Sequence, residues 1–315
     1  GDAMKRRTLI QRGLSSLSVA AGIVSARSNA AASGRSQANE TRSGGASKQN
    51  RKRQASEHLD SGEMHTQKPP TEPIRTEPLG GQRDLLYLLY PGFTTLDFYG
   101  PHSALGLMGY RAHVVARDLE PVVSDSYVAT VPTLTFDEMP TDPAVVLVPG
   151  GSIGTAIAAR DPEFLRALKR VAAGARYVAS VCTGSIILGA AGLLEGKRAT
   201  SHWAARDHLK SFGAKPVPER YVIDGRIATS AGVSAGIDLG LRLTSILADE
   251  EYAKAVQLNM EYAPTPPFSA GTPESAPPKL VAMMQEHYGG LLNEFTKVGE
   301  AYRGARSPST IGGKR

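Results

Sequence analysis

Cysteine and long apolar runs are scarce in this chain of 315 residues. A single thiol, that of Cys182, excludes an intrachain disulfide framework and any metal site built from several thiolates. No run of 18 or more apolar residues exists, which excludes a conventional membrane-spanning helix. Aromatic residues are absent from 1–80, a stretch with 13 Lys and Arg against 7 Asp and Glu. Residues 81–315 carry 23 of each sign, so the net charge of +6 does not predict a nucleic-acid partner for them.

The first 80 residues divide into two segments of different composition. Residues 1–32 contain Arg6 and Arg7, then the weakly apolar stretch 13–24, then small residues, which is the order of an export signal. The paired arginines resemble a twin-arginine signal, so we expect export to the periplasm; the alternative is a cytoplasmic protein with a basic, alanine-rich terminus. Residues 33–80 have too few apolar side chains to offset the entropy of ordering, which predicts a disordered tether.

From residue 84 onward, short apolar runs alternate with helical patterns. Near-continuous apolar runs that end at Pro-Gly are typical of strands buried on both faces. Strands are predicted at 85–90, 112–116, 144–148 and 176–181, a hairpin at 222–228, helices at 96–108, 161–173, 183–194, 233–262 and 279–303, and an extended arm at 264–278. This alternation predicts an α/β fold with a mostly parallel, doubly wound sheet, in one domain at 81–303 with a disordered tail at 304–315.

The strongest candidate for chemistry is Cys182, which stands between an apolar strand and an apolar helix. A nucleophile elbow has this arrangement, and the small residues Ser180, Thr183, Gly184 and Ser185 would relieve its crowding. At such a helix start we expect the pKa of the thiol to be lowered. The alternative is that Cys182 is a small buried hydrophobic residue.

Other strand ends carry further candidates. Gly150 and Gly151 follow a predicted strand, where their N–H groups would either bind a developing anion or merely form a tight turn. Asp97 lies in the opening turn of a predicted helix, where it would either interact with the helix dipole or share a proton with a thiol. His202 follows the cysteine by 20 residues and would form either a Cys–His dyad or a structural contact.

Several motifs together resemble a known family. The sequences ASVCTGS at 179–185 and LLEGKRATSHW at 193–203 resemble the ThiJ/PfpI superfamily. Three further segments point to its isocyanide (isonitrile) hydratase branch: TLDFYGP at 95–101, GVSAGID at 232–238 and VQLNMEYAPTPPF at 256–268. The resemblance covers about 83–285 and implies a flavodoxin-like, class I glutamine-amidotransferase-like fold with a cysteine nucleophile elbow.

The resemblance also implies roles for single residues. Cys182 would be the nucleophile, Asp97 its acidic partner, and Thr183 a hydroxyl that holds the carboxylate. The amides of Gly150 and Gly151 would line the anion site, and Val233 would pack beside the nucleophile. His202 would then be structural. The expected protein is a homodimeric lyase for a small molecule, with no metal and no organic cofactor. Ser230 and Ala231 stand where glycines are expected, which would mean a changed substrate.

Other functions remain open beside hydration. A relative in the same superfamily would act as an amidase, a protease or an aldehyde-processing enzyme, with a Cys–His pair or a Glu partner. A sensing domain of a transcriptional regulator would need a helix-turn-helix module, and the 30 residues after 285 are too few for one. A non-catalytic thiol-based stress protein would not depend on Asp97.

Overall fold

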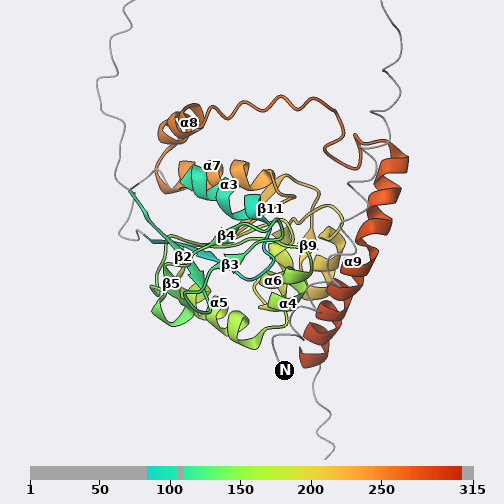
Figure 1. Cartoon of the computed structure of the whole chain (residues 1–315), viewed down its shortest axis with the longest axis horizontal. Coiled ribbons are helices and arrows are strands. Elements are labelled where there is room, and N and C mark those ends of the chain that lie inside the picture. The colour runs from blue at the N-terminus through green and yellow to red at the C-terminus, as the bar shows by residue number, and fades with distance from the viewer. Residues whose placement is uncertain (1–83, 106–108, 307–315) are drawn as a thin grey trace, which may run out of the picture. The chain divides into compact units, whose positions relative to one another are not determined.

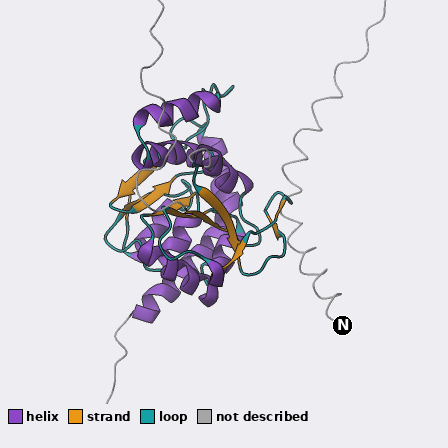
Figure 2. Ribbon diagram, turned by 90° about the vertical axis from the view of Figure 1, so that its left-hand side faces the viewer, coloured by secondary structure: helices purple, strands orange, loops and turns teal. Residues whose placement is uncertain are grey.

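The computed structural model describes residues 84–105 and 109–306, and this part of the chain contains a seven-stranded sheet with helices on both faces (Figures 1 and 2). The export segment predicted at 1–32 and the tether predicted at 33–80 lie outside the described residues. The prediction of an α/β fold with a mostly parallel, doubly wound sheet is confirmed.

All strand pairs in the main sheet are parallel except the pair formed by β10 (Tyr221–Asp224) and β11 (Ile227–Ser230), which is the predicted Asp-Gly hairpin. Two small sheets pair β3 (Val122–Val123) with β4 (Ala129–Thr130) and β8 (Arg198–Ala199) with β9 (Lys215–Pro216). The spatial order of the main sheet is β10 (Tyr221–Asp224), β11 (Ile227–Ser230), β7 (Tyr177–Val181), β6 (Val145–Val148), β1 (Asp84–Leu88), β2 (Arg111–Ala116) and β5 (Leu134–Thr135).

The central strands are buried on both faces, as their apolar runs predict. Every residue of β1 and β6 is buried. Asp84, the one charged residue in these two strands, receives hydrogen bonds from Arg111 at 2.8 and 2.9 Å and lies 2.8 Å from Nε2 of His113. These partners make a buried carboxylate tolerable at the start of β1, and the hydrogen bonds from Arg111 lower its pKa.

Helices cover the two faces of the sheet in separate groups (Figure 1). On one face α3 (Thr95–Leu105) packs against α7 (Ala235–Leu247), and α8 (Glu250–Asn259) packs on α7. The other group consists of α4 (Ile153–Ala158), α5 (Pro162–Gly174), α6 (Gly184–Ala190) and α9 (Pro278–Arg306), with the short helices η2 (Phe136–Glu138) and η3 (Arg206–Phe212).

Two helix predictions need correction. The helix predicted at 233–262 is two helices, because Asp249 adopts an extended backbone and its side chain accepts a hydrogen bond from the amide of Tyr252 at 2.7 Å. Asp249 is therefore the N-cap of α8, a role that local sequence patterns only weakly indicate. Residues 304–306, predicted as tail, continue α9, while 307–315 lie outside the described residues.

Within the described residues, none of the helices combines the length and the apolar character that crossing a membrane requires.

Candidate active site

The carboxyl ends of three neighbouring strands bring the predicted site residues together. The loop after β1 leads to Asp97 on α3, the loop after β6 contains Gly150 and Gly151, and β7 ends directly before Cys182. Backbone hydrogen bonds join two of these loops, since the amide of Thr94 donates to the carbonyl of Gly150 at 2.8 Å. The site thus lies where ligands of parallel α/β sheets bind.

Cys182 occupies a strained elbow. Its φ of 56° lies in the left-handed region, which is unusual for a residue with a side chain. The surrounding chain holds this conformation: the amide donates to Ala231 at 2.9 Å, and the carbonyl accepts from Ser201 at 3.0 Å and from Ser185 at 3.2 Å. Such strain is typical of functional sites, where it fixes the direction of a side chain.

Asp97 is fully buried in the first turn of α3 and forms a pair with the thiol. Its Oδ2 accepts a hydrogen bond from the amide of Gly150 at 2.9 Å. Oδ1 accepts no hydrogen bond within the described residues. The carboxyl and the thiol of Cys182 interact, since each contributes to the shifted pKa of the other. Burial raises the pKa of Asp97 to about 7, so this carboxyl can both give and take a proton near neutral pH.

The thiol of Cys182 does not have the lowered pKa that the elbow predicts. Burial, and then the charge of Asp97, raise the pKa of Cys182 well above its ordinary value. The amides of Val233 and Thr183 act in the opposite direction because they donate hydrogen bonds to the sulfur. The sequence indicates the helix start but not the depth of the thiol, which is only 6% exposed. The raised pKa favours the protonated thiol in the free protein.

The glycine amides hold the site together and are not free to bind an anion, contrary to the expectation above. The amide of Gly150 is used by Asp97, and the amide of Gly151 donates to Oγ1 of Thr183 at 3.1 Å. Thr183 in turn donates to the carbonyl of Gly151 at 2.9 Å and lies 2.9 Å from the hydroxyl of Thr155. Thr183 therefore fixes the Gly-Gly loop, and no hydrogen bond joins it to Asp97. The amide hydrogens directed at the sulfur come from Val233 and Thr183 instead.

Gly150 is required because the backbone and Asp97 approach each other closely. A Cβ at this position would lie 2.7 Å from Oδ2 of Asp97 and 2.7 Å from both the amide and the hydroxyl of Thr183. Real Cβ atoms do not make such contacts, and the neighbouring atoms are held by hydrogen bonds. A glycine here is thus a condition for the geometry of the acid–thiol pair.

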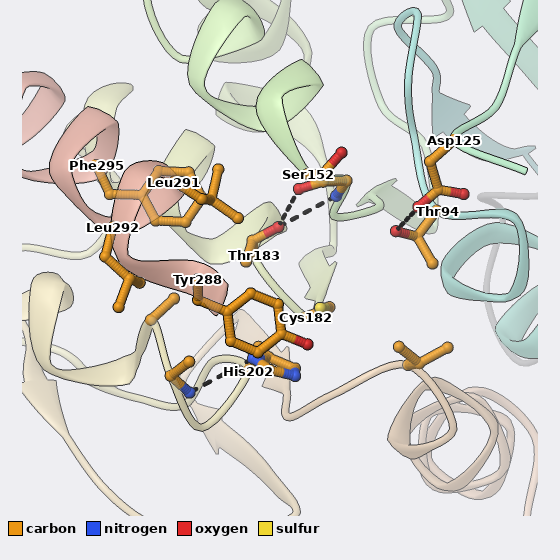
Figure 3. A pocket seen from close by; sticks show the side chains of 14 residues that line it. Thr94, Asp125, Ser152, Cys182, Thr183, His202, Tyr288, Leu291, Leu292 and Phe295 are labelled. Carbon is orange, nitrogen blue, oxygen red and sulfur yellow. Dashed lines mark hydrogen bonds between the residues drawn. The ribbon is translucent and has the colours of Figure 1, made fainter. Parts of the chain in front are cut away.

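Cys182 opens into a cavity of about 240 Å³ whose walls are mostly apolar (Figure 3). One wall comes from α9, a helix about a hundred residues further along the chain, through Tyr288, Leu291, Leu292 and Phe295. Sequence reasoning missed this wall, although the spacing of i, i+3, i+4 and i+7 indicates a buried helix face. The remaining lining residues are Thr94, Asp125, Gly151, Ser152, Thr183, His202, Ala204, Ala205 and Val233.

His202 lines the same cavity but does not form a dyad with the thiol. Its ring packs at 5.6 Å from that of Trp203 and at 5.4 Å from that of Tyr288. Its Nδ1 accepts a long hydrogen bond of 3.4 Å from the amide of Ala204. Burial lowers the pKa of His202 to about 4, so the ring is neutral at physiological pH. No cluster of three potential metal ligands occurs among residues 84–105 and 109–306.

Comparison with known proteins places this geometry in a family. The model of the DJ-1/PfpI family matches residues 83–245, which span the sheet and the acid–thiol pair. This chain belongs to the DJ-1/PfpI family. The family membership agrees with the resemblance inferred from the motifs.

Individual DJ-1/PfpI relatives range from near to distant. The isonitrile hydratase of Pseudomonas putida is 44% identical over 215 residues, which cover 68% of this chain and 93% of the relative. A ThiJ/PfpI family protein from Pseudomonas syringae has been solved; it is 43% identical, with a TM-score of 0.70 over 75% of this chain and 98% of that chain. The transcriptional regulator CdhR of Pseudomonas aeruginosa is 32% identical over 51% of this chain and 49% of its own length.

Proposed function

We propose that this DJ-1/PfpI protein hydrates an isocyanide, R–N≡C, to the corresponding N-substituted formamide. The observation that carries the proposal is the buried pair of Asp97 and Cys182, two groups that shift each other's pKa beside a mostly apolar cavity. The 44% identity to an isonitrile hydratase supports the same reaction. The terminal carbon of an isocyanide must receive both a nucleophile and a proton, and this pair supplies the two at one place.

The first step would add the thiol across the terminal carbon. Asp97 accepts the thiol proton and passes it to the carbon, while the sulfur of Cys182 forms a bond to the same carbon. The product is a thioimidate, R–N=CH–S–Cys, in which the carbon has gained the sulfur and the hydrogen of the original thiol. A carboxyl with a pKa of about 7 suits this transfer, since it binds and releases the proton at similar cost.

The second step would release the formamide with water. Asp97 helps to deprotonate a water whose oxygen adds to the thioimidate carbon, while the nitrogen gains a hydrogen. The resulting R–NH–CH(OH)–S–Cys loses the thiol as its hydroxyl becomes the formamide carbonyl, and the proton returns to the sulfur. The N–H groups of Val233 and Thr183, which point at the sulfur, would stabilise the charge that develops on the departing thiolate. No electrons are gained or lost overall.

A Cys–His enzyme, such as an amidase or a protease, is less consistent with the site. No hydrogen bond joins His202 to Cys182 among the described residues, and the neutral ring has no carboxylate to orient it. A non-catalytic thiol protein would not depend on Asp97, so the Asp97→Asn variant distinguishes that function from hydration.

Turnover of methyl isocyanoacetate, followed by the formyl proton signal of the product in NMR spectra, tests the proposal. We expect Cys182→Ala to abolish turnover, and Asp97→Asn to lower it by at least 100-fold because acid–base catalysis is lost. Asp137→Asn, at an exposed position, is the matched control for removal of a carboxylate. Full activity of a folded Asp97→Asn variant would contradict the proposed mechanism.

We also propose that the protein forms a homodimer. Apolar side chains beside the site are exposed: Leu96 and Tyr99 on α3 are 40% and 36% accessible, and Tyr127 and Val128 at the β3–β4 hairpin are 65% and 41% accessible. A hydrogen bond of 3.0 Å between the hydroxyls of Tyr99 and Thr130 joins the helix to the hairpin, so these residues share one surface. Light scattering should give the mass of a dimer, and Leu96→Asp should give a monomer; a monomeric wild type would refute the proposal.

Export through a twin-arginine signal remains a proposal that rests on residues outside the described part of the chain. Replacing Arg6 and Arg7 by Lys should keep the protein out of the periplasm, because the signal depends on the paired guanidinium groups. Unchanged accumulation of this variant in the periplasmic fraction would overturn it.

A further inference from the structure

Asp125 is a charged residue of the cavity that the proposed reaction does not use. It lies in the loop between β3 and β4 and lines the cavity that contains Cys182 (Figure 3). Its position is fixed: Oδ2 accepts a hydrogen bond of 2.6 Å from the hydroxyl of Thr94, and the amide donates to the carbonyl of Phe93 at 2.9 Å. The carboxylate of Asp125 is therefore held on the wall of the cavity, where it would lie beside a bound ligand.

None of the described residues that line the cavity balances this negative charge. No lysine or arginine occurs among the described residues that line it. The imidazole of His202 is neutral, because burial lowers its pKa to about 4. The charge of Asp125 is felt within the site, since it contributes to the raised pKa of Asp97. A ligand with its own negative charge would therefore meet one or two carboxylates and no cation.

The adjoining hollow does not supply the missing positive charge. It shares His202 and Val233 with the cavity and is lined by two arginines and two glutamates, namely Arg206, Arg220, Glu219 and Glu274. Arg220 already forms an ion pair with Asp238. The charges of this hollow are thus balanced, and the negative charge beside the thiol remains.

We propose that Asp125 is a specificity-determining residue that excludes carboxylate-bearing ligands from Cys182, so that the substrate carries an uncharged substituent. The apolar wall formed by Tyr288, Leu291, Leu292 and Phe295 is complementary to such a substituent. The nature of the substrate rests on the proposed hydration, whereas the exclusion of anions at the thiol does not.

Alkylation of Cys182 in the full-length protein tests the exclusion without any need for turnover. Iodoacetamide and iodoacetate are similar in size, but only the second is an anion. The ratio of their rates on the same thiol cancels any change in the pKa or exposure of Cys182. We expect Asp125→Asn to raise the rate with iodoacetate relative to iodoacetamide by roughly tenfold, the order expected for two like unit charges about 10 Å apart at a protein site. Asp137→Asn should leave the ratio unchanged, and Thr94→Val, which keeps the charge, should change it less than threefold.

Methyl isocyanoacetate and the isocyanoacetate anion provide the second test. The wild type should hydrate the ester with at least a tenfold higher kcat/KM than the anion. Asp125→Asn should reduce this ratio of the two kcat/KM values, whereas Asp137→Asn should leave the ratio unchanged. If neither isocyanide reacts while the alkylation ratio still shifts, the proposed function fails and the exclusion stands. An alkylation ratio unaffected by Asp125→Asn overturns the inference, as does the failure of both reagents to reach Cys182.

Discussion

The buried carboxyl of Asp97 should make the stability of the protein depend on pH in an unusual direction. Its pKa is about 7 in the folded chain, because burial disfavours the charged form, whereas an unfolded aspartate titrates near 3.9. Between these values the unfolded chain has lost a proton that the folded chain keeps. The contribution of Asp97 to stability is therefore fully present below about pH 4 and is lost as the pH rises to about 7.

The size of this effect follows from the shift. Three pKa units correspond to roughly 4 kcal/mol, an order of magnitude that coupling to the thiol of Cys182 will reduce. Asp97→Asn has the same shape and keeps an oxygen that accepts from the amide of Gly150, but it cannot ionise. We expect the free energy of unfolding of the variant, relative to that of the wild type, to rise by a few kcal/mol from pH 5 to pH 8.

Urea unfolding followed by circular dichroism at pH 5, 6, 7 and 8 measures this difference. Comparison with Asp137→Asn, whose side chain is 95% exposed, separates the buried carboxyl from the general effect of lost charge. An equal pH dependence of the free energy of unfolding in the wild type and in Asp97→Asn would contradict a raised pKa of Asp97. A variant that loses stability relative to the wild type as the pH rises would contradict it as well.

Four further changes have expected outcomes. Gly150→Ala should lower kcat at least 100-fold in the formamide assay, because its methyl group would overlap Asp97. Thr155→Val should lower the free energy of unfolding in urea by about 1–2 kcal/mol, since its buried hydroxyl links three partners. His202→Asn should keep kcat within tenfold of the wild type; a folded variant as inactive as Cys182→Ala would indicate a Cys–His dyad. A chain that starts at Gly81 should keep the melting temperature and the activity, because the preceding residues lack aromatic side chains.

The strand ends are the part of the site that the sequence predicts well. Apolar runs that stop at Pro-Gly or at Cys182 mark both the sheet and its carboxyl edge, since a strand buried on two faces needs an unbroken run. The elbow follows from a cysteine between such a strand and a helix. Asp97 is the harder case, because spacing alone does not distinguish a dipole interaction from a partnership with the thiol.

Distant contacts and burial account for what the sequence did not indicate. The wall from α9 reaches the cavity from far along the chain, and Asp125 enters from a two-stranded hairpin too short to leave a strand pattern. The direction of the thiol pKa depends on the depth of Cys182, which no local motif encodes. The glycine amides illustrate the same limit, since their hydrogen bonds to Asp97 and Thr183 are a property of the assembled site.

Trapping the covalent intermediate tests whether the reaction passes through a thioimidate on Cys182. Wild-type protein mixed rapidly with methyl isocyanoacetate and quenched in acid should show, by intact-protein mass spectrometry, a transient mass increase equal to one substrate molecule. Peptide mapping should place it on Cys182, and it should decay as methyl N-formylglycinate forms. Formation of the formamide at the wild-type rate by the Cys182→Ala variant, or an adduct on any other residue, would show that Cys182 is not the nucleophile.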